Sequence, residues 1–237
     1  MDFTAKNFRY VTTGFGDFAQ RVQQGDKLYL RALSREKPSE KPAVLADDFP
    51  ALASDFVLPP QLSLVAESLF SSVLRLSGPV NMWLHYDVMA NVYCQIGGSK
   101  RLLLFPPSDV EHLPFAPGAS SSSIDVFSSL DSPELVNTHP HEAVLSAGEV
   151  LFLPPLWLHT ATPTSDKSIA VNVFFKDLDD GHYAAGRDVY GNRDLAAYEK
   201  GRQDVARIAK SFQKLPAEVR EFYLLRLADE LRGRARG

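Results

Sequence analysis

A succession of short apolar stretches separated by turn residues constrains the fold of this chain most. The stretch SSVLRLSG (71–78) alternates Val73 and Arg75 with Leu74 and Leu76, the period-two pattern of a half-buried strand. Further stretches with strand character lie at 27–34, 82–88, 91–96, 101–105, 141–153 and 168–176. The pattern predicts eight or nine short strands and no intervening helix before residue 180. Such an order favours an all-β sandwich or barrel over a parallel α/β sheet.

The connections between these stretches carry their own predictions. GGSK (97–100) is typical of a Gly-Gly hairpin, with RLLLFPP (101–107) as the returning strand. Residues 35–63 contain five prolines and are expected to be irregular, with a short helix near 50–56. Residues 114–141 are rich in Ser, Pro and Asp and predict a long surface loop, in which Ser120–Ser123 form either a substrate lid or simply a flexible segment.

The pattern becomes helical after Asn192, and we predict a boundary between a β domain (1–186) and a helical segment (187–237). Two helices are expected, at 194–215 and 216–237, with an apolar stripe that must be covered by the barrel or by a second copy. The β domain holds 13 Lys and Arg against 21 Asp and Glu, whereas the helical segment holds 12 against 8. The basic segment is either a surface for a negative partner or a solvated helical face.

Composition excludes several classes of protein. A chain of 237 residues that is 45% hydrophobic can bury one sizeable core, and a net charge of −4 argues against a general polyanion binder. The single cysteine, Cys94, excludes an internal disulfide framework. The sequence has neither a run of 18 apolar residues nor a signal-peptide pattern, so we expect a soluble, cytoplasmic protein without membrane contact.

His85 and Asp87 interrupt the apolar stretch NMWLHYDVMAN (81–91) with two ionisable side chains. Burial of an unpaired carboxylate is unfavourable, so a partner is expected. If the stretch is a strand, residues i and i+2 face the same side. One imidazole and one carboxylate then supply two ligands of the 2-His-1-carboxylate site typical of non-haem Fe(II). The alternative is a core histidine that is hydrogen-bonded to its neighbouring carboxylate without a metal.

A third ligand is required, and the other histidines are His112, His139, His141, His159 and His182. His159 lies in GEVLFLPPLWLHTA (148–161), where a Gly turn, an apolar strand and a Pro-Pro stop precede it. It is the only candidate at the end of a clearly buried strand. His139 and His141 lie in the loop NTHPHE, where solvent exposure is expected.

Three stretches, LHYDVMANVYCQIGGSKRLLLFPPSD (84–109), AGEVLFLPPLWLHTA (147–161) and VNVFFK (171–176), resemble the JmjC-type, cupin-like 2-oxoglutarate oxygenases. The resemblance covers roughly residues 27–230. LHYDVMAN, DVYGNRD and LPAEVREFYLLRL more specifically resemble the JmjC enzymes of wybutosine biosynthesis, which act on phenylalanine tRNA. The resemblance implies a double-stranded β-helix (jelly-roll) core with Fe(II) and 2-oxoglutarate as cofactors. It also implies hydroxylation of the modified guanosine side chain, or support of its late modification.

The resemblance assigns roles position by position, and the metal-ligand and catalytic positions fall on His85, Asp87 and His159. Lys100 matches the lysine that pairs with the distal carboxylate of 2-oxoglutarate, and Tyr29 the tyrosine that shares it. Asn91 and Asn172 match polar residues near the other end of this cosubstrate. Outside this context, Lys100 could be a solvated hairpin lysine and Tyr29 a plain core aromatic.

The substrate leaves alternatives open. For phenylalanine tRNA, the residues expected to contact phosphates are Arg202, Arg207, Lys210, Lys214, Arg220, Arg226, Arg232, Arg234 and Arg236. The same helices could form a homodimer, as the resembling enzymes do. The acidic β domain keeps a JmjC protein hydroxylase or demethylase as an alternative, and a non-catalytic cupin-type domain that binds tRNA or a partner is a third.

The resemblance also bears on the extent of the protein. In fungi a similar domain sits at the C-terminal end of a larger protein, after a methyltransferase and a kelch-like propeller. The resembling stand-alone enzymes carry more residues ahead of the first strand than this chain does. We therefore expect this chain to be a piece of a longer multidomain protein.

Overall fold

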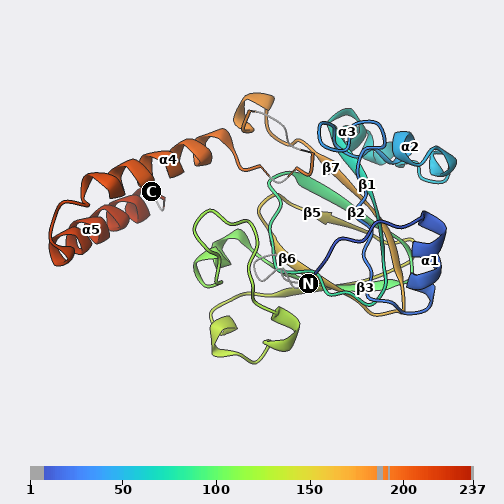
Figure 1. The fold of residues 1–237 in the computed structure, drawn as a ribbon, viewed down its shortest axis with the longest axis horizontal. Helices are drawn as coiled ribbons and strands as arrows, with labels where there is room; N and C mark the ends of the chain where they lie inside the picture. The colour runs from blue at the N-terminus through green and yellow to red at the C-terminus, as the bar shows by residue number, and fades with distance from the viewer. Residues whose placement is uncertain (1–7, 186–188, 192, 236–237) are drawn as a thin grey trace. The chain divides into compact units, whose positions relative to one another are not determined.

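The computed structural model describes residues 8–185, 189–191 and 193–235 (Figure 1). The chain divides into two compact units, residues 1–193 and 194–237, and each is described by itself. The boundary predicted between residues 186 and 187 falls outside the described residues, as do Arg236 and part of the motif DVYGNRD.

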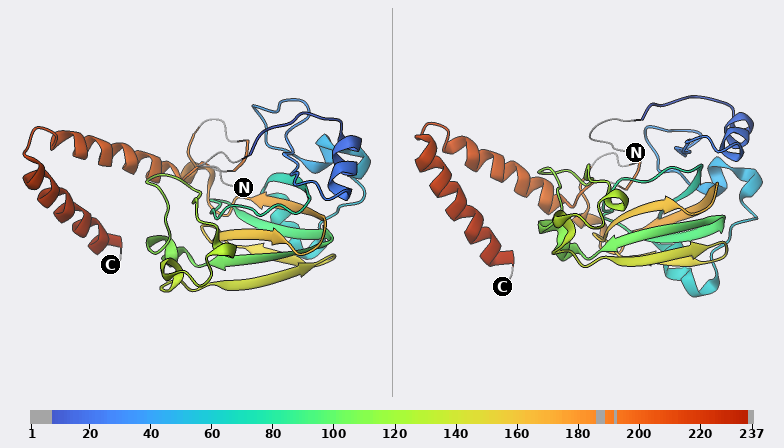
Figure 2. Two further views of the ribbon diagram at one scale, coloured as in Figure 1. Left: turned by 60° about the horizontal axis from the view of Figure 1, so that its bottom comes forward. Right: turned by 90° about the horizontal axis from the view of Figure 1, so that it is seen from below.

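In its described residues, the first unit is built on seven strands in two antiparallel sheets. The strands are β1 (Leu69–Ser77), β2 (Ala90–Gly97), β3 (Ser99–Phe105), β4 (His141–Ser146), β5 (Val150–Leu153), β6 (Leu158–Pro163) and β7 (Ser168–Phe175). Sheet A has the order β1-β7-β2-β5, and sheet B the order β4-β3-β6. The two sheets lie one over the other as layers (Figure 2). The predicted all-β jelly-roll core with C-terminal helices is confirmed.

Strands that follow each other along the chain mostly lie in opposite sheets. The predicted hairpin at residues 97–100 is wrong, because β2 belongs to sheet A and β3 to sheet B. Gly98 makes this crossing with φ of +72°, and a Cβ atom there would lie 2.1 Å from the carbonyl oxygen of Lys167. The glycine therefore serves a sharp passage between two sheets rather than a two-residue turn within one.

Burial divides each sheet into an inner and an outer face. The space between the sheets is filled by Tyr93 and Ala170 of sheet A with Leu102, Leu104 and other residues of sheet B. The outer face of sheet A packs against the short helices α2 (Leu45–Asp48) and α3 (Ser63–Glu67), as Figure 1 shows. Buried Cys94 is one of the residues that pack on that outer face.

The number and placement of elements before residue 180 differ from the prediction. Residues 27–34 are not a strand, since they pair only with the end of β1, where the Leu30 N–H donates to the Leu76 carbonyl. Helix α1 (Phe15–Gln23) was not predicted. Only Phe18 and Val22 of α1 are buried, against Leu76, and this pair is too short a pattern to reveal a helix. Short 3₁₀ helices complete the unit: Pro50–Leu52, Pro60–Leu62, Pro107–Glu111, Val126–Ser128, Pro133–Leu135 and Asp180–His182.

The Ser-, Pro- and Asp-rich stretch at 114–141 is more ordered than a surface loop. Val126 and Leu135 are buried with Leu113 against Phe105 and Leu158, on the outer face of sheet B. Among the described residues, no helix outside this stretch packs on that face. The stretch is therefore what shields the face from solvent.

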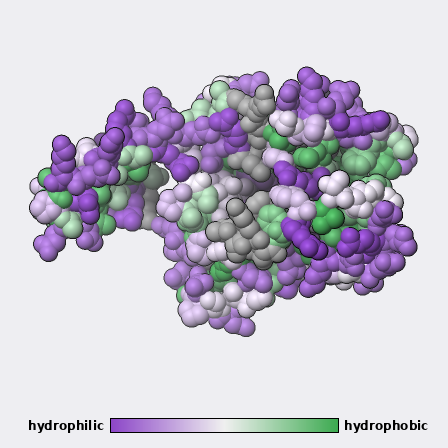
Figure 3. Space-filling model, viewed as in Figure 1, coloured by the Kyte–Doolittle hydropathy of each residue, from purple (hydrophilic) through white to green (hydrophobic). Residues whose placement is uncertain are grey.

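The second unit is a helical hairpin of α4 (Ala196–Ser211) and α5 (Ala217–Ala235), as predicted. No described residue of either helix is buried. Large apolar side chains stand exposed on both helices, including Val205, Phe222, Tyr223, Leu225 and Leu231. Figure 3 shows such hydrophobic residues scattered among hydrophilic ones on the hairpin. Among the described residues, none of the helices combines the length and apolar character needed to cross a bilayer.

Candidate metal centre

His85 and His159 are brought side by side by their backbones. The N–H of His85 donates to the carbonyl of His159 at 3.0 Å, and the N–H of His159 donates to the carbonyl of His85 at 2.7 Å. Directly opposed residues in an antiparallel pair project their side chains to the same face. The two imidazole rings accordingly lie with their centroids 4.3 Å apart.

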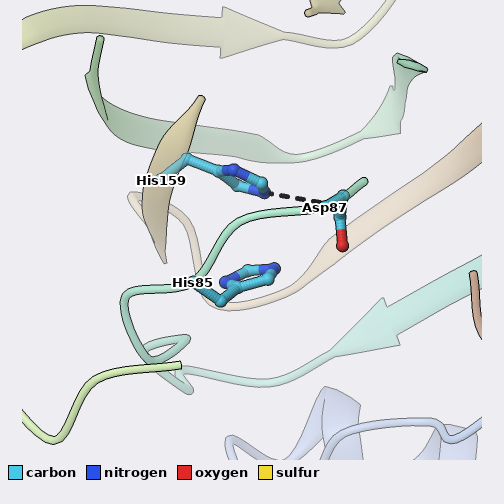
Figure 4. A group of neighbouring side chains, drawn as sticks. All are labelled: His85, Asp87 and His159. Carbon is cyan, nitrogen blue, oxygen red and sulfur yellow. Dashed lines mark ion pairs between the residues drawn. The ribbon is translucent and has the colours of Figure 1, made fainter. Parts of the chain in front are cut away.

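Asp87 reaches the same space although the predicted strand at 82–88 is not continuous. Only single bridges form at His85, to His159 and to Ser121, so the strand periodicity does not explain the position of Asp87. Its carbonyl instead accepts the N–H of Leu156, in the loop that leads to His159. Its Oδ2 lies 3.7 Å from Nε2 of His159, and Figure 4 shows the three side chains converging.

Both imidazoles have their tautomer set by main-chain groups. Nδ1 of His85 lies 3.0 Å from the carbonyl oxygen of Trp83, and Nδ1 of His159 lies 2.9 Å from that of Trp157. Because a carbonyl oxygen only accepts, each Nδ1 must carry the proton, and each Nε2 keeps its lone pair. Burial, followed by the charge of His159, lowers the pKa of His85 to about 4, so this ring is neutral near pH 7.

The three side chains suit a divalent ion. Each offers one ligand atom, and these atoms lie within 4.8 Å of one another. Two ligands that are each about 2.1 Å from one ion lie at most about 4.2 Å apart, so a small contraction would complete the site. Two imidazole nitrogens and one carboxylate oxygen form the donor set of non-haem Fe(II) sites. Within the described part of the chain, the other four histidines belong to no such group.

One of those histidines has a different partner. Nδ1 of His139 lies 2.8 Å from a carboxylate oxygen of the buried Asp109, and the His139 backbone N–H donates to the other oxygen. The His139 side chain is otherwise exposed, in line with the sequence. This pair connects the segment after β3 to the start of β4.

The inner face of sheet A is polar where a core would be expected. Residues 71 and 75 of β1, 172 and 168 of β7, and 91, 93 and 95 of β2 share this face through the strand register. Buried side-chain atoms without a protein hydrogen-bond partner occur here on Ser71, Asn91, Tyr93, Gln95 and Asn172. Unsatisfied buried polar atoms are rare in folded proteins. Their concentration on one face favours a polar ligand that would satisfy them.

Lys100 projects from β3 toward this face. It is 5% exposed, and its ammonium lies 5.8 Å from the ring centroid of Tyr93 in the opposite sheet. No described carboxylate lies within ion-pair distance of it. Burial, and then the charge of Arg75, lowers the pKa of Lys100 to about 8. A buried cation without a counter-ion favours an anionic ligand.

Tyr29, Arg75 and Tyr93 complete this end of the space. The half-buried Tyr29 forms an antiparallel backbone bridge with Ser77. The Arg75 guanidinium lies 5.9 Å from the centroid of the Tyr29 ring. Burial raises the pKa of Tyr93 above its ordinary value, so its hydroxyl stays protonated and able to donate. No sequence motif marked Arg75 or Tyr93 as residues of the site. The alternation of side chains along β1 and β2 could have revealed them, because it places both residues on the same sheet face as Asn91 and Asn172.

The basic residues predicted to contact phosphate are spread over the hairpin. Arg207, Arg232 and Arg234 form ion pairs within their own helices. Arg202 and Lys210 have no ion pair among the described residues, and Arg226 borders a hollow between the helices with Phe212, Tyr223, Leu227, Asp229 and Glu230.

Comparison with known proteins bears on the family. Residues 1–181 match the family model described as "Cupin-like domain". The chain belongs to the cupin-like family. Over its full length it is 79% identical to part of "tRNA wybutosine-synthesizing protein 4" of Neurospora crassa, and it spans 20% of that protein. A protein of the same name from Gibberella zeae is 66% identical over 98% of the chain, which spans 22% of it.

A second group of relatives is matched over most of its length. The "tRNA wybutosine-synthesizing protein 5" of Danio rerio is 36% identical over 99% of the chain, which covers 74% of that protein. The resemblance inferred from the motifs at 84–109, 147–161 and 171–176 is confirmed. This cupin-like chain therefore spans about a fifth of the fungal relatives and about three quarters of the animal one.

Proposed function

We propose that this chain is an Fe(II)- and 2-oxoglutarate-dependent oxygenase that acts on phenylalanine tRNA in wybutosine biosynthesis. The observation that carries the proposal is the pairing of a His-Asp-His group with a buried, uncompensated Lys100 inside one sandwich. One end of this arrangement suits a metal ion, and the other suits a carboxylate.

His85, Asp87 and His159 would hold the iron through Nε2, a carboxylate oxygen and Nε2. When bound, the iron and 2-oxoglutarate supply oxidation of a C–H bond with O₂, coupled to release of succinate and CO₂. The Trp83 and Trp157 carbonyls keep both imidazoles in the tautomer that can bind metal. Their hold on Nδ1 also orients the two rings.

Lys100 would neutralise the distal carboxylate of 2-oxoglutarate, and the Tyr29 hydroxyl would share that carboxylate. Asn91, Tyr93 and Asn172 each present a polar atom without a protein partner, and these atoms would bind the rest of the cosubstrate. The apolar residues between the sheets, such as Leu102 and Leu104, exclude water around it. This exclusion strengthens the interaction of Lys100 with an anion.

Support for the tRNA substrate comes from the relatives, which are named for wybutosine synthesis on tRNA. It also comes from the basic hairpin, where Arg202, Lys210 and Arg226 are free of ion pairs among the described residues. Neutralisation of phosphates by such side chains would make tRNA binding weaker as salt increases.

The hairpin also supports a homodimer. Phe222, Leu225 and Leu231 are each at least 57% exposed. A helical hairpin with no buried residue gains little stability alone, and a second copy would cover these side chains. Light scattering tests this: we expect twice the chain mass, and a monomer after Phe222→Glu and Leu225→Glu together.

The function is tested by incubating the protein with Fe(II), ascorbate and 2-oxoglutarate and measuring succinate by mass spectrometry. Asp87→Asn should abolish succinate formation, whereas His112→Asn, outside the metal group, should leave it unchanged. Product analysis of phenylalanine tRNA and of histone or ankyrin peptides then separates the tRNA enzyme from a protein hydroxylase. The absence of succinate from a folded, iron-loaded protein would favour the non-catalytic alternative.

A further inference from the structure

The guanidinium of Arg31 lies close to the rings of two tyrosines that are distant in sequence. Its guanidinium carbon is 4.9 Å from the ring centroid of Tyr10 and 5.0 Å from that of Tyr190. It also donates a hydrogen bond to the Tyr190 hydroxyl. We call these three residues the tyrosine–arginine sandwich. Because its members come from three separate segments of the first unit, it is a tertiary arrangement and not a local turn.

The sandwich is accessible to solvent. Tyr10 is 65% exposed and Tyr190 39% exposed, and Arg31 is also exposed. No described carboxylate lies within ion-pair distance of Arg31. The guanidinium therefore keeps donors for an external anion, and the tyrosines keep ring surface for stacking.

Two residues of the tyrosine–arginine sandwich, Arg31 and Tyr190, are connected to segments of the candidate site. Arg31 follows Tyr29 by two residues, and the intervening Leu30 is hydrogen-bonded to Leu76 of β1. Gly191, next to Tyr190, is packed so that a Cβ atom there would lie 3.4 Å from Sδ of Met89. Met89 follows Asp87 by two residues. Arg31 and Tyr190 thus each belong to, or pack against, a chain segment that also holds residues of the candidate site.

We propose that the tyrosine–arginine sandwich is a stacking platform for an unpaired nucleobase of the RNA substrate, with Arg31 contacting the adjacent phosphate. This inference rests on the proposed function and adds a recognition element to it. Bases in RNA loops are recognised by stacking on aromatic rings and on guanidinium planes. An acidic peptide would engage Arg31 alone and leave the exposed ring faces without a role.

The test uses the 237-residue chain and a fluorescently labelled RNA hairpin with the anticodon-loop sequence of phenylalanine tRNA. Fluorescence anisotropy measures its affinity. Tyr10→Ala and Tyr190→Ala should each weaken binding roughly 5- to 100-fold, the range for loss of one base–aromatic stack. Tyr10→Phe, which keeps the ring, should bind within about twofold of the parent by the same reasoning.

Two controls separate recognition from folding. Phe152→Ala removes another exposed ring of the same unit and should leave RNA affinity unchanged. Succinate formation in the absence of RNA should be equal in all variants, since none of the substituted side chains belongs to the proposed metal or cosubstrate site. Arg31→Gln should weaken RNA binding and reduce its dependence on salt.

The outcomes are distinguishable. If the parent binds the hairpin and the alanine variants bind it equally well, the platform is overturned and the proposed function stands. If the parent makes succinate but binds neither the hairpin nor phenylalanine tRNA, the tRNA proposal and the platform both fail. If the alanine variants lose binding to a labelled poly-glutamate peptide while the parent binds no RNA, the sandwich is a peptide site and the nucleobase role is overturned.

Discussion

His85 and His159 face each other across a backbone pairing in which each residue donates its N–H to the carbonyl of the other. This pairing joins residues 74 positions apart and places their imidazole centroids 4.3 Å apart. Asp87 then needs only to enter the space beside two rings that are already in place. The metal group is therefore preorganised by the main chain.

Metal binding should stabilise the folded protein through this group. We expect Mn(II), used as a redox-stable substitute for Fe(II), to raise the melting temperature by about 5–10 °C at 100 times its dissociation constant. Asp87→Asn keeps the size of the side chain but removes the charge, and it should abolish the shift. His112→Asn serves as the control, and calorimetry measures both. An undiminished shift in the Asp87→Asn protein would contradict the assigned ligands.

Affinity for 2-oxoglutarate should fall as the pH rises above about 8, because the pKa of Lys100 in the free protein is lowered to about 8. Above that value the side chain is neutral and attracts the carboxylate less. Titration calorimetry from pH 6.5 to 9.5 measures this trend. Lys100→Met should bind weakly at every pH, and Lys100→Arg should remove the decline because arginine stays charged. A pH-independent affinity in the parent would exclude Lys100 as the carboxylate partner.

The same ionisation affects stability in the opposite direction. Between the lowered pKa of about 8 and the ordinary value of 10.5, the unfolded chain binds a proton at Lys100 that the folded protein has lost. The contribution of Lys100 to the free energy of unfolding therefore rises with pH across this window. Below pH 8 the burial of its charge destabilises the fold fully. Urea unfolding of the parent and of Lys100→Met at pH 7 and pH 9.5 should show a smaller rise for the variant.

Gly98→Ala should destabilise the two-sheet β core and displace Lys100. Position 98 has a positive φ, and a Cβ atom there would lie 2.1 Å from a backbone oxygen that cannot move freely. We expect a loss of about 1–3 kcal/mol in the free energy of unfolding together with weaker 2-oxoglutarate binding. Gly16→Ala in α1 meets no atom within 4 Å and should be neutral or slightly stabilising. Equal stability of the two variants would show that the crossing tolerates a side chain.

The core between the sheets should respond to cavity formation. Leu102 is 1% exposed, so Leu102→Ala is expected to lower the free energy of unfolding by about 2–5 kcal/mol. Leu64→Ala removes the same atoms at a position that is 67% exposed and should change it by less than about 0.5 kcal/mol. Chemical denaturation of both variants checks the difference.

The sequence was informative where a local pattern and the tertiary fold agree. Alternation along residues 71–78 predicted β1, the strand-like stretch 168–176 predicted β7, and helical spacing predicted α4 and α5. The motifs also singled out the three residues that the structure brings together. The pairing of His85 with His159 could not be predicted from spacing, because it depends on a long-range backbone register.

Other features were set by tertiary structure alone. The Gly-Gly pattern at 97–98 could not distinguish a hairpin from a passage between two sheets. The stretch at 27–34 has strand-like side chains, but its backbone pairs only with the end of β1. Arg75 belongs to no recognisable motif. Only the strand register shows that it lies beside Tyr29 and close enough to Lys100 for its charge to act there.

The contacts from Nδ1 of His85 and His159 to the carbonyls of Trp83 and Trp157 have an evolutionary consequence. Every amino acid supplies a carbonyl, so the residues at 83 and 157 can change during divergence without loss of the support for either imidazole.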